Sequence, residues 1–307
     1  MQRRDFLSLS AITGATALLN SASRATAADT ASADVSWKLP VPEKPAQLNL
    51  CLQWGAIPGG AINQKLDFLE ANGFAAVELP TGKWLFDNHS AFKKALEGRK
   101  LTVATACGPS DFSHAAKAKR DAEVAKFLPQ LEVLGDLKSV GLILCPARRT
   151  VALGFSELRE DFINNTGKRL AEHAAKHGTS IVLEPLTRGE TPFLNLVADG
   201  ANIARAIGPG ATVMGDFWHM SKEETSCLGA FISGGTLLSH VHIASLKDRK
   251  IPAMEPKYDK YVDGFRGLKI IGYRGAVSLE GGFPKGADKT KLILTMVKYL
   301  RDQWEQA

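Results

Sequence analysis

The chain has 307 residues, of which 45% are hydrophobic and 23% are charged. This length and composition allow a large buried core, in one or two domains, and exclude a fibrous or intrinsically disordered protein. The formal net charge is +6, and acidic residues are interspersed with the basic ones, as in residues 117–126, so the charge pattern does not require a nucleic-acid partner.

The N-terminal segment is typical of a twin-arginine export signal. Residues 3–7 read RRDFL, residues 11–19 form a short apolar stretch, and residues 25–27 read Ala-Thr-Ala, which fits an A-x-A cleavage site. The apolar stretch is too short for a stable membrane span, so a membrane tether is the weaker alternative. We therefore expect a signal peptide over residues 1–27, a Pro-rich linker over residues 28–46, and a periplasmic or otherwise exported domain over residues 47–307.

Removing the expected signal lowers the net charge only slightly. Residues 1–27 contain three arginines and one aspartate, so the mature chain carries 38 − 3 = 35 basic and 32 − 1 = 31 acidic residues, a charge of +4. The four cysteines have no paired short spacing and predict neither a zinc site nor a disulfide framework; they are Cys51, Cys107, Cys145 and Cys227.

Beyond residue 46, short apolar segments alternate with longer amphipathic ones. Eight segments have the length and composition of buried strands, beginning at Leu48, Phe74, Leu101, Val140, Ser180, Thr212, Leu238 and Ala276. Each is followed by a segment with apolar residues at helical spacing, and several of these end on glycine. The alternation predicts a parallel sheet, and eight such units predict an α/β fold with a single closed (β/α)8 TIM barrel. No G-x-G-x-x-G follows the first strand, which disfavours a dinucleotide-binding fold.

The last four expected strands end in side chains that can bind a metal ion. The C-terminal ends of barrel strands surround a common mouth, and there the sequence has Glu184, Asp216, His242 and Glu280. Taken alone, each could be a structural ion-pair partner, and Asp216 or the later Ser221 could cap a helix. Three carboxylates around one point are unfavourable without a cation. The set therefore predicts one divalent ion, with a ligand chemistry that suits Mn²⁺, Mg²⁺ or Co²⁺ better than Zn²⁺.

The remaining histidines have different expected positions. His240 lies two residues before His242, on the same side of its strand, and we expect it one layer below as a hydrogen-bonded residue. His219 follows the strand that ends at Asp216, and we expect it to contact a substrate oxygen, with an ordinary loop histidine as the alternative. We expect the other four on the surface; they are His89, His114, His173 and His177.

Residues at the ends of the first three strands are also candidates for the mouth. Trp54, Glu78 and Cys107 occupy these positions, and all three could line a pocket there. Core packing explains Trp54 and Cys107 almost as well.

Four segments in the second half of the chain resemble a known family. LEPLTRGE, GDFWHM, HVHIASLKDRKIP and GYRGAVSLEGG are similar, in order and spacing, to the xylose-isomerase-like TIM barrels grouped as sugar-phosphate isomerases and epimerases, and most of all to ketose 3-epimerases and hydroxypyruvate isomerase. The resemblance is sharp over residues 181–283 and only architectural before them. It implies that the four mouth residues named above bind one divalent metal and that the two glutamates among them, Glu184 and Glu280, act as acid and base.

The resemblance also implies that His219, Glu190 and Arg249 bind substrate. Relatives often continue past that arginine with a Gly-containing turn and an acidic residue, whereas this chain reads RKIPAMEPKYDKYVDGFRG. The resemblance therefore supports metal binding and proton transfer better than it supports a particular substrate. Family members form dimers and tetramers, so a homo-oligomer is compatible with the resemblance.

The expected reaction is proton transfer through a metal-stabilised enediolate of a keto-sugar or a related hydroxy-carbonyl compound. Return of the proton gives an epimer or an isomer, while loss of a β-substituent gives elimination, so a lyase acting on 3-keto-glycosides is the alternative enzyme. A non-catalytic sugar-binding barrel is a further alternative. An abasic-site endonuclease is disfavoured, because its multinuclear zinc centre needs more histidines at strand ends. Export and the lack of a glycine-rich phosphate loop favour a free sugar, an oxidised glycoside or a sugar acid as the substrate.

Overall fold

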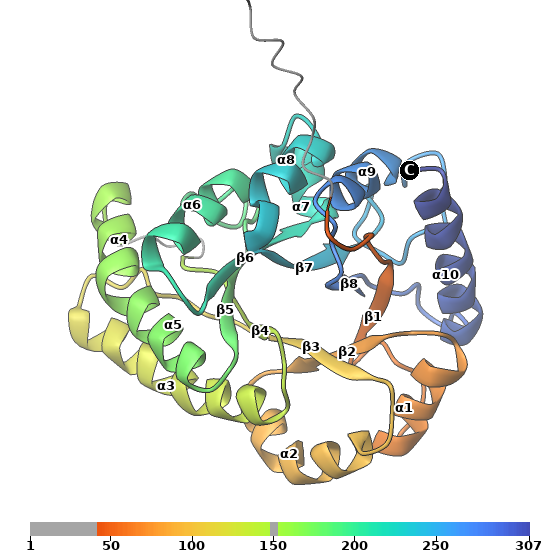
Figure 1. The fold of residues 1–307 in the computed structure, drawn as a ribbon, viewed down its shortest axis with the longest axis horizontal. Helices are drawn as coiled ribbons and strands as arrows, with labels where there is room; N and C mark the ends of the chain where they lie inside the picture. The colour runs from red at the N-terminus through yellow and green to blue at the C-terminus, as the bar shows by residue number, and fades with distance from the viewer. Residues whose placement is uncertain (1–41, 148–152) are drawn as a thin grey trace, which may run out of the picture. The chain divides into compact units, whose positions relative to one another are not determined.

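The computed structural model describes residues 42–147 and 153–307, so the expected signal peptide and most of the expected linker lie outside the described residues. Eight strands form a closed barrel in which neighbouring strands are parallel and follow chain order, with β1 pairing with β8 (Figure 1). The strands are β1 Asn49–Gln53, β2 Ala76–Pro80, β3 Thr102–Cys107, β4 Gly141–Leu144, β5 Ser180–Leu183, β6 Ala211–Asp216, β7 Leu238–Ile243 and β8 Ala276–Leu279. Each begins within two residues of its expected start, which confirms the single (β/α)8 barrel.

Helices surround the sheet on the outside (Figure 1). They are α1 Ile62–Ala71, α2 Lys83–Leu96, α3 Lys117–Asp136, α4 Phe155–Asp161, the π-helix η1 Phe162–Thr166, α5 Gly167–Lys176, α6 Val197–Ile207, α7 Phe217–Glu223, α8 Cys227–Gly234, the 3₁₀-helix η2 Gly235–Leu237, α9 Val262–Ile270 and α10 Lys289–Glu305. Among the described residues, no helix has the length and apolar character needed to cross a membrane.

The connection between β6 and β7 was expected to hold a single helix, but it holds two α-helices, α7 and α8, followed by the 3₁₀-helix η2. Asp216 caps α7 by accepting a hydrogen bond from the backbone N–H of Trp218 at 2.7 Å. Ser226 begins α8 in the same way, by accepting from Gly229 at 3.1 Å. Ser221, the other cap considered, lies inside α7 and donates to the carbonyl of Trp218. The helix-cap interpretation of Asp216 is therefore correct, and it leaves the second carboxylate oxygen available to the barrel mouth.

The main apolar core lies between the sheet and the helices, with fully buried residues such as Leu66, Phe127 and Phe265. Inside the barrel, small side chains pack separately from this core; they are Cys51, Ala76, Ala104 and Ala276. Because side chains alternate along a strand, Gln53 and Glu78 lie on the same inward face, one layer nearer the mouth. The small layer thus leaves room for polar side chains above it.

Candidate active site

The four expected ligands come together at the barrel mouth. Backbone hydrogen bonds hold the two glutamates just past their strands, from Glu184 N to Leu144 O at 3.0 Å and from Glu280 N to Ile243 O at 3.1 Å. Asp216 pairs with His242 in the register of β6 and β7. One ligand atom from each of Glu184, Asp216, His242 and Glu280 lies within 4.8 Å of all the others. Glu184 and Glu280 are 96 residues apart in the chain, yet the closed barrel brings their side chains together.

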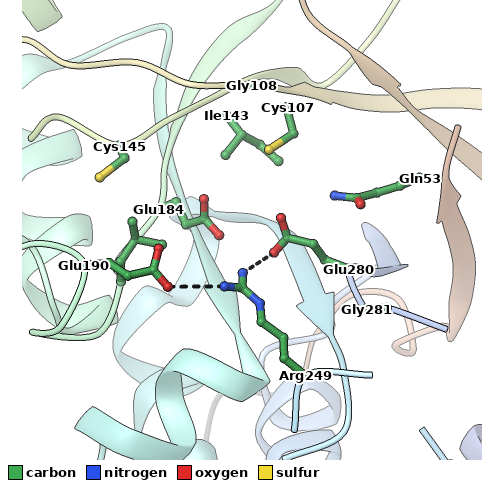
Figure 2. A pocket seen from close by; sticks show the side chains of 12 residues that line it. Gln53, Cys107, Gly108, Ile143, Cys145, Glu184, Glu190, Arg249, Glu280 and Gly281 are labelled. Atoms are coloured by element: carbon green, nitrogen blue, oxygen red, sulfur yellow. Dashed lines mark hydrogen bonds and ion pairs between the residues drawn. The ribbon is translucent and has the colours of Figure 1, made fainter. Parts of the chain in front are cut away.

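The mouth contains a cavity of about 380 Å³. Figure 2 shows the carboxylates of Glu184 and Glu280 directed into it, with the guanidinium of Arg249 between Glu190 and Glu280. This volume falls in the range of small-molecule sites. Cys107, expected as either a wall or a core residue, also lines this cavity. Trp54 packs against Trp84 and Phe92 and lines a smaller neighbouring cavity of about 160 Å³.

His242 connects this cluster to a second buried carboxylate. Its Nδ1 lies 3.1 Å from Glu280 Oε2 and 3.5 Å from Glu184 Oε1, and its Nε2 lies 2.8 Å from Glu78 Oε2. Within the described residues, His242 Nδ1 and Glu184 Oε1 are buried atoms without a hydrogen bond of acceptable geometry. Two unsatisfied ligand atoms facing the same point fit a bound cation.

Glu78 holds the far side of His242. Its Oε2 lies 2.8 Å from Nε2 of both His240 and His242 and accepts from Thr105 Oγ1 at 3.1 Å, while its Oε1 accepts from Gln53 Nε2 at 2.8 Å. An ionised carboxylate can only accept, so both imidazoles donate through Nε2. In neutral His242 the lone pair then lies on Nδ1, toward the three mouth carboxylates.

From the sequence, Glu78 was expected only to line the pocket, and its contact with His242 was not predicted. A carboxylate inside the apolar segment at the end of β2 was the available signal. His240, expected as a hydrogen-bonded histidine of the layer below, has that role in the structure.

The cluster has too little positive charge to ionise all its carboxylates easily. Burial, assisted by the charge of Glu280, raises the pKa of Asp216 to about 7 and raises that of Glu184. Burial would also raise the pKa of Glu280, but His242 and Arg249 outweigh it and lower this pKa to about 2. Burial opposes protonation of His242, yet the charges of Glu78 and Glu280 raise its pKa well above the usual value. A divalent cation would supply the missing positive charge.

Arg249 was expected to bind substrate, and in the structure it also contacts two of the four expected metal ligands directly. Its Nη2 is 2.6 Å from Glu280 Oε2 and 3.3 Å from Asp216 Oδ2, and its Nη1 is 3.3 Å from Glu190 Oε1. The guanidinium carbon lies 4.8 Å from the ring centroid of Trp218, a cation–π contact. Arg249 thus links Glu190 to two of the four clustered side chains.

The loop that carries Arg249 is tied to the end of β8. Gly282 N donates to Arg249 O at 3.0 Å, and Ile251 N donates to Gly282 O at 2.9 Å. A Cβ at Gly281 would lie 2.7 Å from the carbonyl oxygen of Lys250, so this approach needs the glycine that follows Glu280. Arg249 itself has a left-handed backbone, with φ of 55°.

His219 is buried at the rim and directs one ring nitrogen toward the cluster. Its Nδ1 accepts from the backbone N–H of Thr187 at 3.0 Å, so Nε2 carries the proton. That Nε2 has no hydrogen-bond partner within the described part of the chain, and it lies 3.7 Å from Asp216 Oδ2. Burial and the nearby charge of Arg249 lower the pKa of His219 to about 3. His219 is therefore a neutral hydrogen-bond donor at ordinary pH.

A family model described as "Xylose isomerase-like TIM barrel" matches residues 66–303. The chain belongs to this family. The match spans both halves of the barrel, whereas the motifs recognised in the sequence cover only its second half.

Curated proteins similar to this xylose isomerase-like barrel include two sugar epimerases. It is 27% identical over 194 residues to the 3-dehydro-D-guloside 4-epimerase of Escherichia coli (strain K12), covering 60% of this chain and 74% of that protein. It is also 27% identical over 181 residues to the L-ribulose 3-epimerase of Methylomonas sp. (strain DH-1), covering 59% of this chain and 62% of that protein.

Solved structures support the fold of this family member. The apo form of 3-keto-D-glucoside 4-epimerase from E. coli superposes with a TM-score of 0.73 at 24% identity, covering 83% of this chain and 100% of that one. D-psicose 3-epimerase from Clostridium cellulolyticum H10, with D-tagatose, gives a TM-score of 0.74 at 18% identity, covering 84% and 99%. At these identities the likeness shows the fold alone.

Proposed function

We propose that this protein is a divalent-metal-dependent sugar epimerase or isomerase acting on a keto-sugar or an oxidised glycoside. The observation that carries the proposal is the convergence of Glu184, Asp216, His242 and Glu280 within 4.8 Å, with His242 Nδ1 and Glu184 Oε1 unsatisfied. The curated relatives named above are both sugar epimerases, which favours epimerisation over isomerisation. Neither is a lyase, so the elimination alternative gains no support from them.

Glu184, Asp216, His242 and Glu280 would hold the metal. When bound, a divalent ion supplies positive charge that stabilises the negative charge developing on substrate oxygens as a carbon-bound proton leaves. The three oxygen donors favour Mn²⁺, Mg²⁺ or Co²⁺ over Zn²⁺. The raised pKa values of Asp216 and Glu184 also fit this assignment, because a nearby cation offsets the cost of ionising these buried carboxyl groups.

The two glutamates are placed to move the substrate proton. Glu184 and Glu280 come from β5 and β8 and direct their carboxylates into one cavity from different sides (Figure 2). A carboxylate on one side removes the proton from the carbon beside a carbonyl, and a carboxyl group on the other side returns a proton to the opposite face. Removal and return of the proton on opposite faces invert the configuration at this carbon and give an epimer.

Three rim residues orient the sugar in this proposal. His219 offers its free Nε2–H as a donor to a substrate oxygen. Arg249 and Glu190, 3.3 Å apart, offer a donor and an acceptor to neighbouring hydroxyl groups. Together with His242, Arg249 lowers the pKa of Glu280, and its contact with this carboxylate at 2.6 Å helps to hold it in place.

Deuterium exchange tests this function. Protein stripped of metal and reloaded with Mn²⁺ is incubated in D₂O with a panel of free ketoses and keto-glycosides. An epimerase incorporates deuterium at the inverted carbon and releases no fragment, whereas a lyase releases one. Glu280→Gln removes the carboxylate charge and should lower the exchange rate at least ~100-fold, while Glu157→Gln on the exposed start of α4 should leave it unchanged. Substrate binding without exchange by the wild-type protein would instead identify a binding protein.

We also propose, from the sequence alone, that residues 1–27 direct export by the twin-arginine route. Replacing both Arg3 and Arg4 by lysine should leave the protein in the cytoplasmic fraction with its signal uncleaved. Processing and export that continue unchanged would contradict this assignment.

A further inference from the structure

A second group of metal-capable side chains lies on the outside of the barrel. It consists of Glu132 on α3 and of His173 and His177 at the C-terminal end of α5. One ligand atom from each lies within 4.8 Å of the other two. In the described residues, the only other such group apart from the mouth cluster is Glu78, His240 and His242, which belongs to the mouth. The sequence indicated only that both surface histidines are exposed.

The two histidines are spaced for chelation. Residues four apart lie one above the other on a helix face, and the ring centroids of His173 and His177 are 4.7 Å apart. Nε2 of His173 lies 3.1 Å from Oε1 of Glu132. Two ligands of a tetrahedral zinc ion, each about 2.0–2.1 Å from it, are roughly 3.4 Å apart. The observed nitrogen–oxygen distance is close to that value, so small side-chain rotations suffice to place both atoms around an ion.

The backbone beneath these side chains is fixed by close packing. Helices α3 and α5 lie side by side on the outside of the barrel (Figure 1). A Cβ at Gly135 of α3 would lie 2.2 Å from the carbonyl oxygen of His177, so this glycine permits a close approach between the helices. A rigid backbone lowers the ordering cost of binding. The negative end of the α5 dipole lies at the same place and favours a cation.

The three donor groups indicate which ions this surface cluster would favour. Two imidazoles and one carboxylate suit Zn²⁺, Ni²⁺ or Cu²⁺, whereas Mg²⁺ and Mn²⁺ prefer oxygen ligands. We propose that Glu132, His173 and His177 form a second metal site, with Zn²⁺-class preference, that cross-links α3 to α5. The side chains of His173 and Glu132 are 24% and 52% exposed, so an ion reaches them directly from solvent. This site is independent of the proposed function at the mouth.

Another surface histidine provides a matched control. His89 Nε2 lies 2.7 Å from Asp136 Oδ2, so this pair also joins an imidazole to a carboxylate. Asp136 additionally binds Lys93, which places a positive charge beside the pair, and no second imidazole completes a group of three there within the described chain. It should not bind Zn²⁺ tightly.

Calorimetric titration of metal-free protein with Zn²⁺ tests the proposal. The wild-type protein should bind one more equivalent than His177→Ala, and Glu132→Gln should weaken that equivalent at least tenfold. His89→Ala should match the wild type. Equal melting temperatures in chelator would show that the variants are folded, and an unchanged rate of deuterium exchange with Mn²⁺ would show that the mouth is intact.

Two results would overturn the proposal. One is a His177→Ala protein that binds as many equivalents as the wild type with affinity within twofold. The other is a His89→Ala protein that also loses an equivalent, since binding would then belong to any surface histidine. Because the readout is the difference between variants, it remains valid even if the mouth binds no metal.

Discussion

Replacing Glu78 by glutamine should weaken metal binding, although Glu78 is not one of the four expected ligands. Glutamine keeps the shape of the side chain but replaces one acceptor oxygen with an NH₂ group that cannot accept a hydrogen bond. In the structure, Glu78 Oε2 lies 2.8 Å from Nε2 of both His240 and His242. In Glu78→Gln, an amide NH₂ placed there would face the Nε2–H of His242, and relief of this clash by a tautomer change would put a proton on Nδ1. That proton would occupy the position through which His242 would bind the ion.

The expected loss of metal affinity can be taken from other proteins in which a carboxylate hydrogen-bonds to a metal-binding histidine. Loss of such a partner costs about 10–100-fold in metal affinity, which corresponds to about 1.4–2.7 kcal/mol. Calorimetric titration of the metal-free protein with Mn²⁺ measures it directly. Thr105→Val is the control, because it removes one hydrogen bond to Glu78 but leaves the carboxylate and both histidine contacts in place. It should change the dissociation constant less than threefold.

One result would contradict this role of Glu78. If folded Glu78→Gln binds Mn²⁺ within twofold of the wild type, the carboxylate does not orient His242 for metal binding. If the wild type binds no Mn²⁺, the metal site itself is wrong. The two failures are therefore distinguishable.

Three further outcomes are expected. Glu280→Gln should lower the rate of deuterium exchange at least ~100-fold, the range of general-base catalysis. Metal affinity should fall by at least about tenfold per pH unit below about pH 7, because an ion that binds there must displace protons from Asp216, whose pKa is raised to about 7, and from His242, whose pKa is raised well above its usual value; an affinity that is constant from pH 5 to 8 would contradict this. His219→Ala should lower kcat/KM about 10–100-fold through loss of one donor, without moving the acidic limb of the pH profile, because His219 stays neutral down to about pH 3.

The barrel could be predicted because its signals are local. Each strand is a short apolar run, and the alternation with helices fixes a parallel arrangement before any contact is known. The four mouth residues followed from the same logic, since strand ends share one side of the barrel. Asp216 combines the expected helix cap with a position in the barrel mouth, because one oxygen caps α7 and the other faces Arg249.

The features that were not predicted from the sequence depend on contacts between residues that are far apart in the chain. The contact between Glu78 and His242 joins residues 164 positions apart and exists only because the closed barrel brings β2 and β7 across from each other. The position of Arg249 depends on pairing between its loop and Gly282 and on a left-handed backbone, neither of which an apolar pattern encodes. The break between α7 and α8 was missed, although the polar residues 221–226 interrupt the apolar pattern there and Ser226 is a residue type that often caps helices.

Anomalous diffraction from crystals loaded with Mn²⁺ tests the central claim most directly. We expect one strong peak at the barrel mouth, within bonding distance of Glu184, Asp216, His242 and Glu280. A fully loaded protein with no peak there, or with a peak that contacts none of these four side chains, would contradict the account.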